Sequence, residues 1–206
     1  PSVALLTAMR QRSLKPNVIT CSTVIRACEG EEWWQALCLL AAMQQHGPQP
    51  NMITYSAAVS ACETSGEWQQ SLHSLVALLQ AGLKPSIISY NVAISACEKV
   101  KKWQHAIGLL AQMAELRLEA DEITYNAAMS ACAKGKEWQQ ALALMAEMQL
   151  RELQPSVITY NVAISAYEKC EQWPQSLALM EAMRRRGMSP RVITYGAAIS
   201  ACEKGK

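Results

Sequence analysis

Cysteine and histidine are the residue types in this sequence that could do metal or redox chemistry. The 206 residues include eight cysteines and three histidines. Eight cysteines in a chain of this size could form a disulfide framework, and a zinc site would need clustered Cys and His at short spacings, but the sequence has no C-x-x-C pair. The three histidines are far apart in the chain: His46, His73 and His105. The sequence therefore predicts no metal site and no cofactor.

Five of the cysteines lie at one phase of a long repeat: Cys28, Cys62, Cys97, Cys132 and Cys202. Tyr167 takes the equivalent place in the remaining copy. Equivalent points on stacked helices lie about 8 to 10 Å apart, which is too far for a disulfide bond. We therefore expect small buried thiols at these positions.

Signatures of enzymes and of membrane proteins are also missing. The chain contains no G-x-x-x-x-G-K, G-x-S-x-G or H-E-x-x-H motif, so no enzymatic activity is expected. No apolar run approaches the roughly 20 residues that span a bilayer, so no membrane role is expected. Nineteen basic and seventeen acidic residues give a formal charge of +2, which provides no global attraction for a polyanion.

The elements that carry these residues belong to a repeat of 35 residues. Tyr90 to Lys99 reads YNVAISACEK, and Tyr160 to Lys169 reads YNVAISAYEK. Prolines and tryptophans keep the same phase: Pro50, Pro85, Pro155 and Pro190, and Trp68, Trp103, Trp138 and Trp173. The sequence thus predicts five full repeats, at 16–49, 50–84, 85–119, 120–154 and 155–189.

Partial repeats are expected at both ends of the chain. Residues 1–15 fit the second helix of a preceding repeat, and residues 190–206 fit the first helix of a sixth. The native protein is therefore expected to be longer. Because neither end reads as a polar capping helix, self-association through the uncapped ends is a further expectation.

Each repeat reads as two helices. The first is expected to run from the proline to the Glu-Lys pair, and the second shows a stripe of apolar residues at spacings of three and four. Gly47, Gly82 and Gly187 follow second helices, where a left-handed cap is expected. One such pair cannot bury its apolar face alone. The sequence therefore predicts an all-α fold, an α-solenoid of stacked helix-turn-helix repeats wound into a right-handed superhelix.

These repeats resemble those of the pentatricopeptide repeat (PPR) family over the whole chain. The resemblance rests on the 35-residue period, on the V/I-I-T-Y-N opening of the first helix and on an A-L-x-L-x-x-x-M pattern in the second. The 34-residue tetratricopeptide repeat opens instead with W-x-x-L-G-x-x-Y, which is not found here. Two features depart from the PPR pattern: tryptophan recurs before the second helix, and Cys21 replaces the tyrosine of I-T-Y-N.

The resemblance implies that one base of single-stranded RNA is read per repeat. The reading residues would be the fifth and the last, counted from the residue before I-T-Y-N. The implied pairs are Ser22 with Asn51, Ser56 with Ser86, Asn91 with Asp121, Asn126 with Ser156, and Asn161 with Arg191. Gly196 opens an unfinished sixth repeat. In the direction of the chain, the pairs suggest A, a purine, U, C and a pyrimidine.

Hydrogen-bond matching gives these assignments a physical sense. The Asp121 carboxylate only accepts, so it suits a base with a ring N–H such as uracil or guanine. The Asn51 amide can instead donate to the ring nitrogen of adenine or cytosine. Asn91, Asn126 and Asn161 have a second interpretation, as residues near a helix start that bond their own backbone.

The resemblance also implies a base-sandwiching residue at the second position of each repeat. Isoleucine fills this position throughout: Ile19, Ile53, Ile88, Ile123, Ile158 and Ile193. Apolar residues at helical spacing are usually core, and that alternative stays open. Four lysines end first helices and are candidate phosphate contacts: Lys99, Lys134, Lys169 and Lys204. Their alternative role is to stabilise the negative end of the helix dipole.

The function expected from the resemblance is sequence-specific binding of single-stranded RNA in the stabilisation, processing or editing of organellar transcripts. Localisation in the mitochondrion or the chloroplast is implied by the family alone. The alternative is a protein-protein interaction scaffold of the helical-repeat type. The salt dependence of binding distinguishes these two functions. RNA affinity should fall steeply as salt rises, because phosphate binding releases counterions, whereas a mainly apolar protein interface should not weaken in this way.

Overall fold

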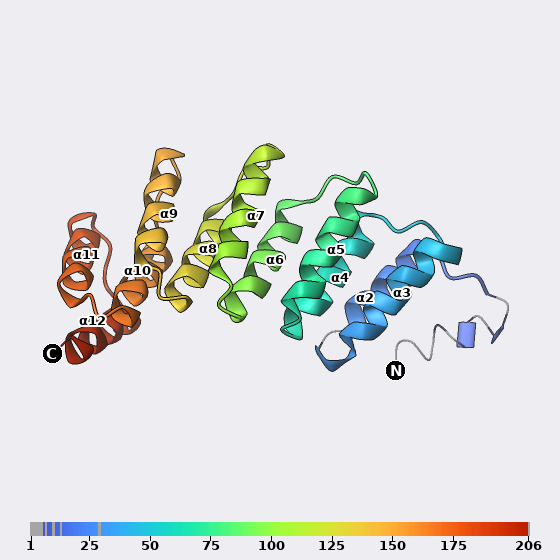
Figure 1. Cartoon of the computed structure of the whole chain (residues 1–206), viewed down its shortest axis with the longest axis horizontal. Coiled ribbons are helices and arrows are strands. Elements are labelled where there is room, and N and C mark those ends of the chain that lie inside the picture. The colour runs from blue at the N-terminus through green and yellow to red at the C-terminus, as the bar shows by residue number, and fades with distance from the viewer. Residues whose placement is uncertain (1–5, 7, 10, 13, 29, 206) are drawn as a thin grey trace. The chain divides into compact units, whose positions relative to one another are not determined.

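The computed structural model describes all residues except 1–5, 7, 10, 13, 29 and 206. Its described residues form eleven α-helices and one 3-10 helix, with no strand (Figure 1). The helices are α2 (Val18–Ala27), η1 (Gly30–Glu32), α3 (Trp33–His46), α4 (Met52–Thr64), α5 (Trp68–Gln80), α6 (Ile87–Lys99), α7 (Trp103–Glu115), α8 (Glu122–Lys134), α9 (Trp138–Leu150), α10 (Val157–Lys169), α11 (Trp173–Arg185) and α12 (Val192–Lys204). The expected all-α fold of helix pairs is confirmed. Most of the helix expected within residues 1–15 lies outside the described residues.

First helices carry even numbers and second helices carry odd ones. The chain forms two compact units, an N-terminal unit of residues 1–96 and a C-terminal unit of residues 97–206. In the N-terminal unit, α4 packs against α2, α3 and α5. In the C-terminal unit, α10 packs against the neighbouring first helices α8 and α12 and against second helices α9 and α11. First helices of adjacent repeats therefore lie in direct contact within each unit.

The residue after each proline, not the proline itself, sets the start of a first helix. Asn51 Oδ1 accepts a hydrogen bond from the Thr54 N–H at 3.0 Å, and Thr54 Oγ1 accepts one from the Asn51 N–H at 3.2 Å. The same capping box begins α8 at Asp121 and α10 at Ser156. The expectation that the helix runs from the proline is therefore wrong by two residues, since the capping residue lies between.

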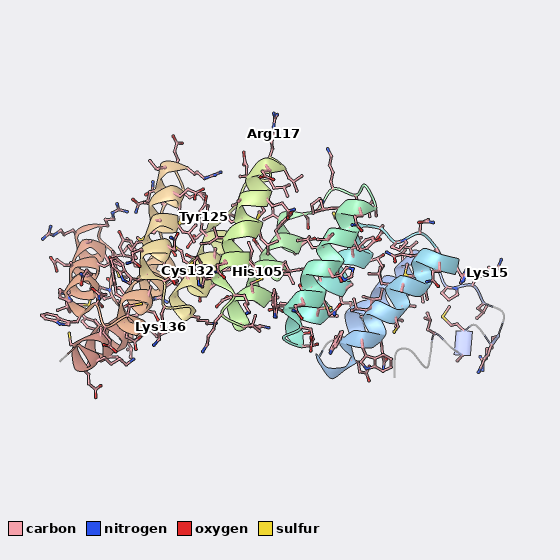
Figure 2. All side chains as sticks on the ribbon, in the orientation of Figure 1. Lys15, His105, Arg117, Tyr125, Cys132 and Lys136 are labelled. Atoms are coloured by element: carbon pink, nitrogen blue, oxygen red, sulfur yellow. The ribbon has the colours of Figure 1, made fainter. Side chains whose placement is uncertain are left out.

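Glycine positions predict the left-handed turn after a second helix in some repeats but not in others. Gly82 and Gly187 have φ of 70° and 75°, as a left-handed cap requires. Gly47 does not, because α3 ends in extended backbone with φ of −107°. Arg117, at the end of α7 (Figure 2), and Glu152 are equivalent to Gly82 and adopt φ of 55° and 63°. The turn is thus retained in repeats that lack the glycine.

The tryptophans that depart from the PPR pattern pack against the next repeat. A Cβ atom added at Gly135 would lie 2.5 Å from Trp103 Cδ1. The same arrangement recurs between Gly205 and Trp173. In both cases, the indole at the start of a second helix covers the end of the first helix that follows. The glycine leaves room for the ring.

Buried core runs along the first helices. Tyr125, labelled on α8 in Figure 2, is fully buried, and its hydroxyl donates to Glu147 of α9 at 3.0 Å. Burial, together with the nearby Glu147 carboxylate, raises the pKa of Tyr125 to about 12. Tyr90 and Tyr160 are the equivalent fully buried tyrosines. No helix in the described part of the chain has the length and hydropathy to cross a membrane.

Candidate nucleic-acid interface

The two proposed reading positions lie close together at the start of the first helices. The fifth residue of a repeat lies just over one turn into a first helix, and the last residue is the N-cap of the next first helix. Asn51, Asp121 and Ser156 each accept a hydrogen bond from the backbone near the start of the helix they cap. The caps are therefore the last-position residues. The fifth-position residues Asn126 and Asn161 bond side chains instead, of Glu122 and Thr194.

A hydroxyl joins the two positions of the first pair. Thr54 Oγ1 lies 2.8 Å from Ser22 Oγ and donates to Asn51 Oδ1 at 3.0 Å. Thr54 is 0% exposed and Ser22 is 6% exposed, so both hydroxyls lose most of their contact with water. Because each needs a partner when buried, this chain of hydrogen bonds holds Ser22 and Asn51 in one fixed arrangement.

In other pairs, the residue equivalent to Thr54 also forms hydrogen bonds to the two reading positions, as serine or as threonine. Ser89 Oγ lies 2.7 Å from Ser56 Oγ and 3.0 Å from Ser86 Oγ, which joins the second pair. In the fifth pair, Thr194 Oγ1 donates to Asn161 Oδ1 at 2.5 Å and accepts from the Arg191 backbone N–H at 3.0 Å. The third pair is divided between the units, with Asn91 in the N-terminal unit and Asp121 in the C-terminal unit.

The fourth pair is arranged differently because an acidic residue precedes it. Glu122 opens α8 where the other first helices have an apolar residue. Its Oε1 accepts from Asn126 Nδ2 at 3.3 Å and lies 3.5 Å from Thr159 Oγ1. The Asn126 Oδ1 atom is buried and has no hydrogen-bond partner within the described residues. This amide therefore keeps an unused acceptor.

The second-position isoleucines are exposed. Their side chains are between 50% and 74% exposed: Ile19, Ile53, Ile88, Ile123, Ile158 and Ile193. The alternative that they belong to the core is therefore wrong. Their spacing resembled a buried stripe, but the stripe that the repeats bury is formed by residues on another face of the same helices.

One pocket brings the predicted residues of the first pair together. It has a volume of about 250 Å³ and lies between α2 and α4. Ile19 and Ile53 line it together with Ser22 and Asn51. Val18, Thr23 and Arg26 complete the lining. Sequence reasoning missed Arg26, whose only signal was an arginine where the other first helices have serine.

Lys134 and Lys204, two candidate phosphate lysines, are held by glutamates of the preceding repeat. Lys134 Nζ lies 2.8 Å from Glu98 Oε1, and Lys204 Nζ lies 2.8 Å from Glu168 Oε1. Ser130 and Ser200 donate to the same two carboxylates. Burial raises the pKa of Glu168, but the hydrogen bonds from Lys204 and Ser200 outweigh it and hold that pKa below its ordinary value.

Lys169 lacks such a partner because Ala133 stands where Glu98 and Glu168 stand in other repeats. Its ammonium group forms no hydrogen bond or salt bridge within the described part of the chain. Burial lowers the pKa of Lys169, and the positive charge of nearby Lys134 lowers it further. An anion bound here would relieve this repulsion. Lys99 ends α6 at the equivalent position.

The cysteines that repeat at one phase are mostly buried thiols. Cys28, Cys62, Cys97 and Cys132 are fully buried, whereas Cys202 is half-buried, and none of the eight cysteines forms a disulfide. Burial raises the pKa of Cys62 and Cys97 to about 11 and, with the Glu137 charge, that of Cys132 to about 12. Within the described residues, no group of three or more His, Cys, Asp or Glu could hold a metal ion.

Thiol reactivity tests this burial. At pH 8, a thiol of pKa about 11 is on the order of a thousandth thiolate, and burial also blocks the reagent. We expect Cys38, which is exposed, to react at once with a chromogenic disulfide, and Cys132 to react only after unfolding in urea. Mass mapping of the modified peptides identifies the sites. Fast labelling of Cys132 in the folded protein would contradict its burial.

Family models match nearly the whole chain. The PPR repeat family matches residues 85–134, 120–167 and 155–204, and the pentatricopeptide repeat domain matches residues 4–64 and 38–100. A comparison with curated protein sequences returned no match.

Solved structures share the fold. The crystal structure of the pentatricopeptide repeat protein PPR10 from maize matches 98% of the chain with a TM-score of 0.76 and 25% identity. PPR10 in complex with an 18-nt psaJ RNA element matches 98% with a TM-score of 0.67 and 18% identity. The chain spans only 29% and 35% of those two chains. The PPR domain of Arabidopsis thaliana protein-only RNase P 1, in complex with tRNA, matches over its full length, covering 98% of this chain with a TM-score of 0.71 and 13% identity.

Proposed function

The chain belongs to the pentatricopeptide repeat family, and from this premise we propose that it binds single-stranded RNA and reads one base per repeat. Members with the same fold have been solved with an 18-nt RNA element and with tRNA. The observation that carries the proposal for this chain is the pocket between α2 and α4. Two exposed isoleucines flank it, and hydrogen-bonding groups line it.

The pocket has the chemistry that a nucleobase requires. A base is flat and apolar on its faces, so Ile19 and Ile53 would contact the two faces. Its edge carries donors and acceptors, which Ser22 and Asn51 would match. The hydroxyl of Thr54 fixes both side chains before the base arrives, which lowers the entropy lost on binding.

The proposed readout in the direction of the chain is A, a purine, U, C and a pyrimidine. The fifth-position residues Ser22, Ser56, Asn91, Asn126 and Asn161 would distinguish purine from pyrimidine. The last-position residues Asn51, Ser86, Asp121, Ser156 and Arg191 would refine the choice. Lys169 is the proposed phosphate contact among the four lysines, since its ammonium group has no carboxylate partner in the described structure. Action on organellar transcripts is proposed from family membership alone.

Exchange of the Asn51 amide for a carboxylate tests this readout. Asn51→Asp keeps the size of the side chain and its capping oxygen, and Asp121 shows that aspartate caps an equivalent helix. A carboxylate only accepts, so it should favour guanine, which has a ring N–H, over adenine, which has none. We expect the A-to-G affinity ratio at the first letter to fall about tenfold, the size of one or two hydrogen bonds.

The measurement is a fluorescence anisotropy titration with single-stranded RNA containing A-A-U-C-U, its G variant at the first letter and the matching DNA. A G variant at the second letter is the internal control, because its ratio should not change in Asn51→Asp. An A preference of the wild type that survives the substitution would contradict readout by Asn51. Absence of RNA binding at low salt would contradict the proposed function itself.

A protein-interaction scaffold is the second candidate function. The observation that favours it is the formal charge of only +2, which provides no general attraction for a polyanion. Binding to a protein through apolar contacts would change little with salt, whereas RNA binding should weaken steeply. If the titration shows no salt-sensitive RNA binding, a pull-down for protein partners tests the scaffold function.

A further inference from the structure

Arg26 lies on the same face of α2 as the residues that line the first pocket. Ile19, Ser22, Thr23 and Arg26 follow the spacing i, i+3, i+4 and i+7, which places them along one stripe of a helix. All four line the pocket between α2 and α4. Arg26 lies one turn beyond Ser22, so its guanidinium can reach past the edge of a base held there.

No other first helix has a basic residue at this position. Arg26 is the ninth residue of its helix, and the ninth residue of the other first helices is serine in every case: Ser60, Ser95, Ser130, Ser165 and Ser200. Serine at this position donates to a glutamate of the preceding repeat where the structure gives its contact, as in Ser130 with Glu98. Arginine at this position replaces a serine hydroxyl with a positive charge.

The first repeat also lacks the terminal lysine. Helices α6, α8, α10 and α12 have 13 residues and end at a lysine, whereas α2 has 10 residues and ends at Ala27. The thirteenth place counted from Val18 falls on Gly30, which belongs to η1. Arg26 is thus the basic residue of the last turn of α2. Helix α4 ends at Thr64 and has no basic residue in its last turn, so α2 is the one of these two lysine-free first helices that carries a positive charge there.

Arg26 is available for a ligand. Its side chain is exposed, and it forms no hydrogen bond or salt bridge with the residues that the structure describes. A guanidinium offers five donors and no acceptor, and it binds the two oxygens of a phosphate in a fork. A base edge needs both donors and acceptors, which Ser22 and Asn51 already provide.

From this geometry we propose that Arg26 binds the backbone phosphate of the nucleotide whose base occupies the first pocket. The inference rests on the proposed function and names a contact that the recurring lysines do not supply. The first pocket would then hold its nucleotide at the base through Ser22 and Asn51, and at the backbone through Arg26. Because every nucleotide carries the same phosphate, the contact by Arg26 would not depend on which base occupies the pocket.

Arg26→Ser tests the contact and installs the residue that the other repeats carry, so the fold should be retained. We expect RNA affinity at low salt to fall about fivefold. A single-stranded ligand loses about 0.7 from its log-log salt slope for each phosphate contact removed, so the slope should fall by about that amount. All four bases at the first letter should be affected equally. Arg26→Lys keeps the charge and should restore most of the slope.

Arg186→Ser is the matched control, because it removes the same charge from an exposed arginine that follows α11. Loss of the same affinity and slope in Arg186→Ser would overturn the proposal, since net charge alone would explain it. An Arg26→Ser protein that binds like the wild type would also overturn it, while leaving the proposed function intact. A loss confined to one first-letter base would assign Arg26 to the base and not to the phosphate. If the wild-type protein fails to bind RNA, both the Arg26 contact and the proposed RNA-binding function are rejected.

Discussion

Gly135→Ala is expected to destabilise the C-terminal unit by about 3 kcal/mol, which is the upper range for an overpacked contact. The added methyl would lie 2.5 Å from Trp103 Cδ1, closer than a carbon atom can approach. Gly135 has φ of −79°, so the backbone accepts alanine and only the indole opposes it. The ring must move, and its packing between two repeats is lost.

The effect can be measured by urea unfolding followed by far-UV circular dichroism. Gly108→Ala is the matched control: Gly108 lies in the middle of α7, with nothing within 4 Å of its missing Cβ. There, the same substitution should stabilise the helix by about 0.5 to 1 kcal/mol. In a Trp103→Leu background, Gly135→Ala should cost less, since the clashing ring is gone. Equal effects of the two alanines would show that the Trp103 contact does not limit the space.

Thr54→Val is expected to cost the N-terminal unit about 2 to 3 kcal/mol, although the two side chains have nearly the same shape. The Thr54 hydroxyl joins Ser22 to Asn51 and also accepts from the Asn51 backbone. Its loss leaves the buried Ser22 hydroxyl without this partner and breaks one half of a capping box. The same variant should weaken the first-letter base preference, because Ser22 and Asn51 are no longer held together.

Thr54→Ser is the control for Thr54→Val. Ser89 occupies the equivalent position in the next repeat and bonds both neighbours, so a serine hydroxyl can do the same work. We expect Thr54→Ser to retain most of the stability and the full base preference. The two quantities come from urea unfolding and from the A-to-G affinity ratio. If valine and serine behave alike in both, the hydroxyl bridge has no energetic role.

The arrangement of helices could be predicted from the sequence because it depends on local signals. Proline, the I-T-Y-N opening and the tryptophan recur at fixed spacing, and each second helix begins at a tryptophan, as the stripe through Trp138 predicts. Where a local signal was ambiguous, the prediction was wrong. Gly47 looked like a left-handed cap but lies in extended backbone, and Arg117 adopts the left-handed turn without being glycine.

The candidate site was only half visible to sequence reasoning. The proposed reading residues were named from the family, but nothing in the pattern showed that Asn51 would be a helix cap or that Thr54 would bridge it to Ser22. The isoleucines could have been core, since an apolar residue at helical spacing does not reveal which face it occupies. Only the packed structure exposes Ile19 and Ile53 on the two sides of one pocket.

The sequence by itself determined that the protein is a helical repeat and which residues are equivalent between repeats, because periodicity is a property of the chain alone. The tertiary structure decided what each equivalent residue does. Ser22 and Thr54 are 32 residues apart, and Lys134 and Glu98 are 36 apart, so these contacts exist only once adjacent repeats stack. A single change such as Ala133 in place of glutamate leaves the period intact but frees Lys169 from a salt bridge. Function in such an array therefore depends on contacts between repeats, which the period does not encode.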